Sequence, residues 1–98
     1  FIYGTRKDGT TPLYRSYSRA IGDHLYTTSE SEARSAGYTY EGIMGFIAIN
    51  NDAKTTALYR LYSSAMGDHF YTSDANEANT AASNGYIREG TTGYVYLP

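Results

Sequence analysis

The chain has 98 residues, a formal net charge of −2 and no cysteine. This length suits one small domain, and without cysteine there are no disulfides, thiolate metal sites or thiol nucleophiles. The slightly acidic charge argues against a nucleic-acid-binding surface, and no apolar stretch approaches the roughly 20 residues of a membrane span. We therefore expect a globular protein that neither binds nucleic acid nor inserts into a membrane.

Tyrosine is the unusual component: it occurs twelve times, beside three phenylalanines and no tryptophan. Its apolar ring and its hydroxyl, which needs a hydrogen-bond partner, suit half-wet surfaces and recognition sites. Strands also favour tyrosine as cross-strand filling. We expect both uses, with most of the tyrosines structural.

Two segments of the chain share one pattern. Residues 13–28, LYRSYSRAIGDHLYTT, match residues 58–73, LYRLYSSAMGDHFYTS, at 11 of 16 positions. The flanking segments match as well, at an offset of 45 before the pattern and of 48 after it. This self-similarity predicts one domain, residues 1–98, made of two tandem repeats, about 1–45 and 46–93, plus a closing C-terminal strand at 94–98.

Each repeat predicts the same elements in the same order. Residues 13–17 and 58–62 alternate and are rich in aromatic side chains, as strands are. The turns at 18–22 and 63–67 lead into Gly-Asp, and residues 24–27 and 69–72 then form the second strand of a hairpin.

A short helix is expected next. Ser29 and Glu32 fit a capping box, and Ser73 or Asp74 takes the cap position in the second repeat. The three extra residues of the second repeat fall inside its helix, so that helix is expected to be longer.

Glycines mark the end of each repeat. Gly37 and Gly85 stand where a left-handed helix terminator belongs. Glu41-Gly42 and Glu89-Gly90 indicate a loop whose backbone glycine sets, and a β-branched or aromatic strand follows. The predicted fold is α+β, mainly an antiparallel sheet with two short helices and a pseudo-twofold internal duplication.

The sequence Asp-His-x-Tyr is the main candidate for binding chemistry. Asp23 follows the turn with its carboxylate free to accept hydrogen bonds, and His24 and Tyr26 share one face of the strand. A carboxylate, a ring nitrogen and an aromatic face together suit a sugar. The second repeat has Asp68, His69 and Tyr71 at these positions. A structural role is equally open, because a turn aspartate and a strand histidine commonly bond to neighbouring groups.

Arg15 and Arg60 stand between tyrosines in the first strand of each repeat. Each can project to solvent, pair with a carboxylate such as Glu41 or Glu89, or bond to a ligand hydroxyl. We favour the salt bridge.

Metal binding and catalysis are less favoured. Asp23, His24, Asp68 and His69 are ligand types that divalent ions accept, but adjacent Asp and His point apart on a strand. No Gly-x-Ser-x-Gly segment occurs, and two equivalent copies suit multivalent binding better than one reaction centre. We predict a binding module with no metal, no cofactor and no catalytic residue, and thus not an enzyme.

The repeat LYR-x-YS…GDH-x-YT…GY…EG resembles a repeat family of unknown function from secreted and surface proteins of bacteria and fungi. As a small, cysteine-free form with two repeats, the chain also resembles the mushroom lectins of the Lyophyllum type. That resemblance implies a homodimeric fungal lectin that binds terminal α-galactosyl glycans or glycoconjugates without a metal. It leaves localisation open between secretion and the cytoplasm of a fruiting body.

In this interpretation the histidines bond to sugar hydroxyls, the aspartates accept from vicinal hydroxyls and the tyrosines stack on the sugar face. The carbohydrate-binding residues are then Arg15, Asp23, His24, Tyr26, Arg60, Asp68, His69 and Tyr71. The alternative is a non-catalytic adhesion or cell-wall targeting module that binds another polysaccharide or a protein. Exposed strand edges at residues 1–3 and 94–96 are the expected dimer contact, although pairing of these edges with each other inside one chain is slightly favoured.

Overall fold

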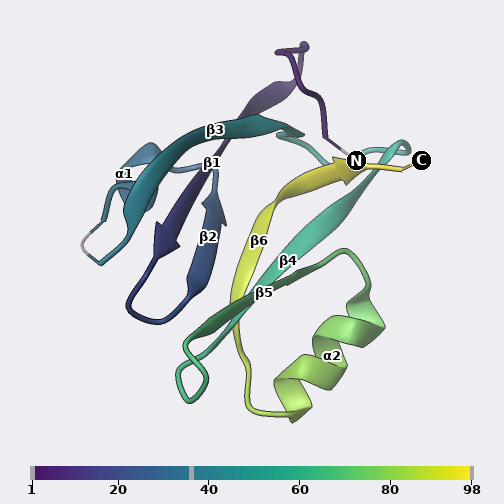
Figure 1. The fold of residues 1–98 in the computed structure, drawn as a ribbon. Coiled ribbons are helices and arrows are strands. Elements are labelled where there is room, and N and C mark those ends of the chain that lie inside the picture. Colours follow the sequence, from purple (N-terminus) through teal and green to yellow (C-terminus); the bar gives the residue numbers. More distant parts are fainter. Residues whose placement is uncertain (1, 36, 98) are drawn as a thin grey trace.

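The computed structural model describes residues 2–35 and 37–97. The strands form one antiparallel six-stranded sheet in the order β2-β1-β3-β6-β4-β5 (Figure 1). In chain order the elements are β1 (Thr10–Ser18), β2 (Asp23–Thr27), α1 (Glu30–Ala33), β3 (Thr39–Ala48), β4 (Thr55–Ser63), β5 (Asp68–Thr72), α2 (Ala75–Ser83) and β6 (Ile87–Tyr96). The expected architecture, mainly an antiparallel sheet with two short helices, is confirmed.

The sheet curls so far that its two edge strands meet. β2 and β5 stand at opposite ends of the strand order, yet they contact each other. In the middle of the sheet, β3 and β6 pair through Ala48 and Tyr94 alone. The sheet therefore has a first part, β2-β1-β3, and a second part, β6-β4-β5, which Figure 1 shows splayed apart around the short central pairing. We call the contact between β2 and β5, made by Asp23, Tyr26, His69 and Tyr71, the seam.

Both predicted hairpins form in the same register. Residues 14–18 pair with residues 23–27, and residues 59–63 pair with residues 68–72. On the helix-covered face of the first hairpin, Ser16 is fully buried and its hydroxyl donates to the carbonyl of Ala33 in α1. The residue 45 positions after Ser16 is Leu61, which is also fully buried.

The helices begin where the sequence predicts. The Ser29 hydroxyl accepts from the Glu32 N–H, and the Asp74 carboxylate accepts from the N–H groups of Asn76 and Glu77. Asp74, rather than Ser73, is therefore the cap of α2. α2 has 9 residues and α1 has 4, which agrees with the extra residues expected in the second helix.

The Glu-Gly pairs lie inside strands, whereas the sequence predicted loops at these positions. Arg60 faces Gly90 but Leu61 faces Arg88, so Glu89 of β6 has no residue opposite it. Gly90 has φ +108°, a conformation that side-chain-bearing residues rarely adopt. Such a bulge bends the strand and redirects a side chain, and here it brings Glu89 to Arg60. β3 has the same register shift beside Arg15.

The C-terminal segment is no separate closing strand and no sheet edge. Residues 94–96 end β6, which lies between β3 and β4. Tyr3 forms a backbone bridge with Phe46, and its ring centroid lies 4.8 Å from that of Tyr96. The two predicted edges therefore touch through rings while their backbones pair elsewhere. Phe1 and Pro98 lie outside the described residues.

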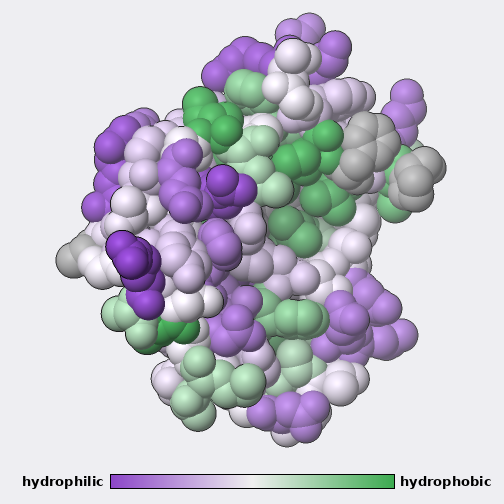
Figure 2. Space-filling view, viewed as in Figure 1, coloured by the Kyte–Doolittle hydropathy of each residue, from purple (hydrophilic) through white to green (hydrophobic). Residues whose placement is uncertain are grey.

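The apolar core is small and tightly packed at one glycine. Ile47 is fully buried, and a Cβ added to Gly93 would lie 2.9 Å from Ile47 Cδ1. Figure 2 shows hydrophobic atoms gathered at the centre of one face, between hydrophilic flanks. A cavity of about 390 Å³ is lined by apolar and tyrosine side chains, namely Ile2, Leu13, Tyr26, Met44, Leu58 and Tyr71.

Neither helix of the described chain has the length and apolar character needed to cross a membrane.

Candidate functional site

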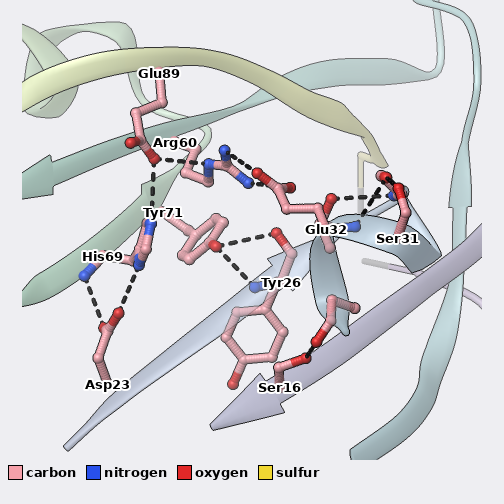
Figure 3. A network of polar contacts seen from close by, with 12 residues as sticks. Ser16, Asp23, Tyr26, Ser31, Glu32, Arg60, His69, Tyr71 and Glu89 are labelled. Carbon is pink, nitrogen blue, oxygen red and sulfur yellow. Dashed lines mark hydrogen bonds and ion pairs between the residues drawn. The ribbon is translucent and has the colours of Figure 1, made fainter. Parts of the chain in front are cut away.

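Asp23 and His69 connect the two parts of the sheet. Asp23 is 2% exposed; its Oδ1 accepts from the His69 backbone N–H at 2.8 Å, and its Oδ2 lies 2.5 Å from His69 Nδ1 (Figure 3). The Tyr38 hydroxyl also donates to Oδ2 at 2.7 Å. Burial acts to raise the pKa of Asp23, but these hydrogen bonds outweigh it and hold the pKa below its usual value. Asp23 is therefore a buried acceptor whose carboxylate bonds to groups of the chain itself, which is the structural role that the sequence left open beside sugar binding.

Tyr71 closes the seam further along. Its hydroxyl accepts from the Tyr26 N–H at 2.8 Å and donates to the Tyr26 carbonyl at 3.0 Å. Tyr26 is on edge strand β2, whose outward backbone groups would otherwise lack a strand partner. Burial raises the pKa of the Tyr71 hydroxyl, so it stays protonated at neutral pH.

Arg60 stands between two carboxylates. Its terminal nitrogens bond to both oxygens of Glu32 at 2.9 and 3.0 Å, and its Nε bonds to Glu89 Oε1 at 2.9 Å (Figure 3). His69 Nε2 lies 3.2 Å from the same Glu89 oxygen. The hydrogen bond from Arg60 lowers the pKa of Glu32, and the bond to Glu32 raises that of Arg60. A continuous polar network thus runs from α1 through β4 and β6 to the seam.

The favoured salt bridges of the two arginines are confirmed. Arg60 pairs with Glu89, and Arg15 pairs with Glu41 at 2.9 Å. Both pairs bring a bulge glutamate to the arginine that lies opposite the following glycine.

A polar cavity of about 140 Å³ opens where the two parts of the sheet meet. It is lined by residues from β2, α1, β4 and β6 and from the segment between β2 and α1, namely Thr27, Thr28, Glu32, Arg60, Glu89, Gly90, Thr91 and Thr92. The Thr92 hydroxyl oxygen is enclosed and has no hydrogen-bond partner among the described residues. A buried polar group without a partner costs free energy, so a ligand that bonded to this hydroxyl would recover that cost.

The residues at the matching positions of the sequence pattern, Arg15, His24 and Glu41, lie in a more open arrangement. His24 Nε2 lies 3.9 Å from Glu41 Oε1, and the His24 ring lies 4.6 Å from Tyr17 and 6.0 Å from Tyr26. The His24 side chain is 45% exposed, against 9% for His69. His24 does not meet Asp68, whose carboxylate accepts from the Tyr86 hydroxyl at 2.8 Å instead.

The structure therefore divides the eight predicted site residues. Asp23, Tyr26, His69 and Tyr71 form the seam, and Arg60 lines the polar cavity. The other three, Arg15, His24 and Asp68, lie outside both.

Sequence reasoning missed the threonines of the cavity and the role of Glu32. The recurrence of Glu-Gly did mark Glu89, but Thr92 has no such signal, because the matching position of the first repeat is Met44. Within residues 2–35 and 37–97, no three His, Asp or Glu side chains are grouped so that they could hold a metal ion.

Comparison with known proteins places the chain in a family but assigns no activity. A family model described as a domain of unknown function matches residues 2–96. No curated protein and no solved structure matches the chain.

Proposed function

The chain belongs to the family "Domain of unknown function (DUF5648)", and we propose that it is a carbohydrate-binding protein without catalysis. In this proposal it holds one sugar in the polar cavity. The observation that carries the proposal is a polar cavity lined by four threonines, one of which, Thr92, has an enclosed hydroxyl oxygen without a hydrogen-bond partner among the described residues. Hydroxyl-bearing ligands supply both donors and acceptors to such groups.

The charge of the cavity favours a neutral ligand. Arg60 faces two carboxylates, Glu32 and Glu89, so the three side chains together carry about one negative charge at neutral pH. A phosphate or carboxylate ligand would meet that charge unfavourably. Arg60 uses three of its five N–H donors on the two glutamates, which leaves donors for a neutral hydroxyl.

The size of the cavity favours a terminal sugar. The cavity has about 140 Å³, well above the roughly 10–15 Å³ that one water molecule needs, so it has space for several hydroxyl groups. In our proposal these belong to the exposed edge of one terminal monosaccharide. Galactose as the terminal residue, a metal-independent mode and a homodimer follow from the resemblance to mushroom lectins.

The seam residues position this cavity in our proposal. His69 holds Glu89, Glu89 holds Arg60, and Asp23 and Tyr71 fix the two parts of the sheet that enclose the cavity. We further propose that the two parts are copies of one unit. The identical hairpin registers and the recurring Arg–Glu pairs, 45 to 48 residues apart, support this duplication.

The decisive variant is Thr92→Val, which removes the hydroxyl and keeps the shape of the side chain. Calorimetric titration with methyl α-galactoside, with and without EDTA, should give binding to the wild type that chelation leaves unchanged. We expect binding to Thr92→Val to be weaker by about tenfold or more, because a buried hydrogen bond is lost. Thr56→Val, a threonine of β4 that does not line the cavity, is the matched control and should bind as the wild type does.

The unfolding free energy provides an independent check on Thr92→Val. Without ligand this variant should be as stable as the wild type or more stable, since it removes an unsatisfied polar group. Equal galactoside binding by Thr92→Val and the wild type would place the sugar elsewhere. Binding of cell-wall polymer but of no galactoside would favour the adhesion or cell-wall targeting alternative.

A further inference from the structure

We propose that the chain has a second saccharide site, in a cavity of about 240 Å³ that α2 forms with β5 and the segment before β6. This cavity, which we call the α2 cavity, is lined by Phe70, Glu77, Thr80, Ala81, Asn84 and Tyr86. The choice of a galactoside as its ligand rests on the proposed function. The α2 cavity itself shares no residue with the polar cavity, so the two sites can be tested apart.

The α2 cavity depends on the part of α2 that extends beyond the length of α1. Ala33 of α1 and Ala78 of α2 hold matching positions of the sequence pattern, and both are fully buried. α1 ends at Ala33, whereas α2 continues to Ser83, and Thr80 and Ala81 of this extension line the cavity. The longer helix, which lies beside β5 in Figure 1, therefore supplies a cavity wall that α1 is too short to form.

Two aromatic rings provide the apolar surface of the α2 cavity. The rings of Phe70 and Tyr86 lie edge to face, with centroids 5.9 Å apart. The Tyr86 hydroxyl donates to the carboxylate of Asp68 at 2.8 Å, which holds this ring in place. Leu25, at the position that matches Phe70, is 4% exposed, whereas Phe70 is half-buried and lines the cavity. Aromatic surface is thus accessible to a ligand where the matching strand has a buried leucine.

Two polar side chains of the α2 cavity have unused hydrogen-bonding capacity. The carboxylate of Glu77 and the carboxamide of Asn84 make no hydrogen bond or ion pair with other residues that the structure describes. Glu32, which matches Glu77 in the sequence pattern, has both carboxylate oxygens bonded to Arg60. Glu77 therefore keeps the acceptor oxygens that its counterpart uses within the chain.

These polar groups favour a neutral ligand that carries hydroxyls. Glu77 is the charged residue of the lining, so an anion would meet it unfavourably. An ammonium group would suit Glu77 and the aromatic rings, but it offers donors alone, and the N–H groups of Asn84 need an acceptor. A sugar hydroxyl is both donor and acceptor. The Thr80 hydroxyl, which donates to the Asn76 carbonyl at 3.0 Å, can still accept from a second one.

The aromatic rings favour galactose among neutral sugars. One axial hydroxyl of galactose leaves neighbouring C–H groups together on the opposite face of its ring, and such an apolar patch rests well on an aromatic side chain. In glucose the same hydroxyl is equatorial, and these C–H groups are divided between the two faces. We therefore expect the α2 cavity to prefer a galactoside to a glucoside.

Amide NMR titration of the full chain with methyl α-galactoside tests this site, because it follows each cavity separately whereas calorimetry sums them. The signals of Thr80, Ala81 and Asn84, including the Asn84 carboxamide, should shift and saturate. Binding at the polar cavity would instead shift Thr91 and Thr92. Methyl α-glucoside should bind the α2 cavity more weakly than the galactoside by about threefold or more, through poorer stacking.

Three variants of the α2 cavity and its surroundings make the test specific. Glu77→Gln keeps the size of an exposed side chain but removes its charge, and should weaken binding there by about fivefold or more. Phe70→Leu introduces the residue of the matching strand and should weaken binding by about threefold or more. Asn76→Ala changes an exposed residue of α2 that does not line the cavity, and should bind as the wild type does.

The outcomes distinguish this site from the polar cavity. Galactoside that shifts no signal of the α2 cavity overturns the proposal, as does binding there that Glu77→Gln and Phe70→Leu both leave unchanged. Thr92→Val should weaken the shifts at Thr91 and leave those at Thr80 as they are. Shifts at the α2 cavity alone would uphold this site and refute the polar cavity, and shifts at the polar cavity alone would do the reverse.

Discussion

His69 Nδ1 lies 2.5 Å from Oδ2 of Asp23, although the two residues come from different copies of the sequence Gly-Asp-His. One copy supplies its aspartate to this contact and the other its histidine. The seam therefore uses the aspartate of one occurrence of the motif and the histidine of the other, while His24 and Asp68 lie outside it.

Replacing Asp23 by Asn should destabilise the fold markedly. The amide loses the charge-assisted bonds to the His69 ring and the Tyr38 hydroxyl in a buried place, at an expected cost of about 2–4 kcal/mol. Urea unfolding measures the change. Asp68→Asn is the matched control: Asp68 is less buried and meets no histidine, so its replacement should cost about 1 kcal/mol or less. Equal costs for the two variants would contradict the role of Asp23 in the seam.

The stability of the chain should fall in acid because of the same network. The pKa values of Asp23 and Glu32 are lowered in the folded protein, so near pH 4 the unfolded chain binds more protons than the folded one. Their contribution is complete above the ordinary carboxyl pKa values of about 4 and is lost as the pH falls below them. Unfolding free energies between neutral pH and about pH 3 should therefore decline. The decline should be shallower in Asp23→Asn, and a curve parallel to that of the wild type would argue against this assignment.

Tyr71→Phe should destabilise the chain by about 1–3 kcal/mol, because it leaves the N–H and the carbonyl of Tyr26 without their partner. Tyr26→Phe is the matched control. The Tyr26 hydroxyl makes no hydrogen bond with the described residues, so its removal should change the unfolding free energy by about 0.5 kcal/mol or less. Thermal unfolding followed by near-ultraviolet circular dichroism distinguishes the two tyrosines.

Gly93→Ala should cost about 1–3 kcal/mol, because the new Cβ would lie 2.9 Å from Ile47 Cδ1 in a fully packed position. Gly4→Ala is the control, since that position has open space and no positive φ. The cost of Gly93→Ala should shrink in an Ile47→Val background, where the colliding atom is absent. A double-mutant cycle of urea midpoints measures this coupling, and a coupling of zero would refute the steric explanation.

The sequence predicted the local elements well because their signals are local. Alternating aromatic residues, the Ser29 and Asp74 caps and the Arg–Glu pairs all depend on residues close in sequence or in the next strand, and all of these were found. The Glu-Gly pairs were misplaced in loops, because a glycine with positive φ serves a bulge as well as a turn.

The seam could not be predicted, because it depends on how far the sheet curls. No local sequence pattern indicates that the Asp23 carboxylate contacts His69 rather than His24. Nor does one indicate that the Glu32 side chain pairs with Arg60 instead of completing the capping box of its own helix. Two sequence-identical motifs thus came to lie in different surroundings. Their distinction is a tertiary property of the fold.

The backbone amides of Tyr26 and His69 belong to edge strands, yet side chains from the opposite part of the sheet hold them. Neither amide depends on the hydrogen-bond ladder of its own hairpin. Their hydrogen exchange should therefore report the transient parting of the two parts while each hairpin stays intact. They should exchange faster than the ladder amides of β1 and β4 under native conditions, and faster still in Asp23→Asn. The two parts of the sheet would then separate transiently along the seam, and hydrogen exchange at the amides of Tyr26 and His69 would report each separation.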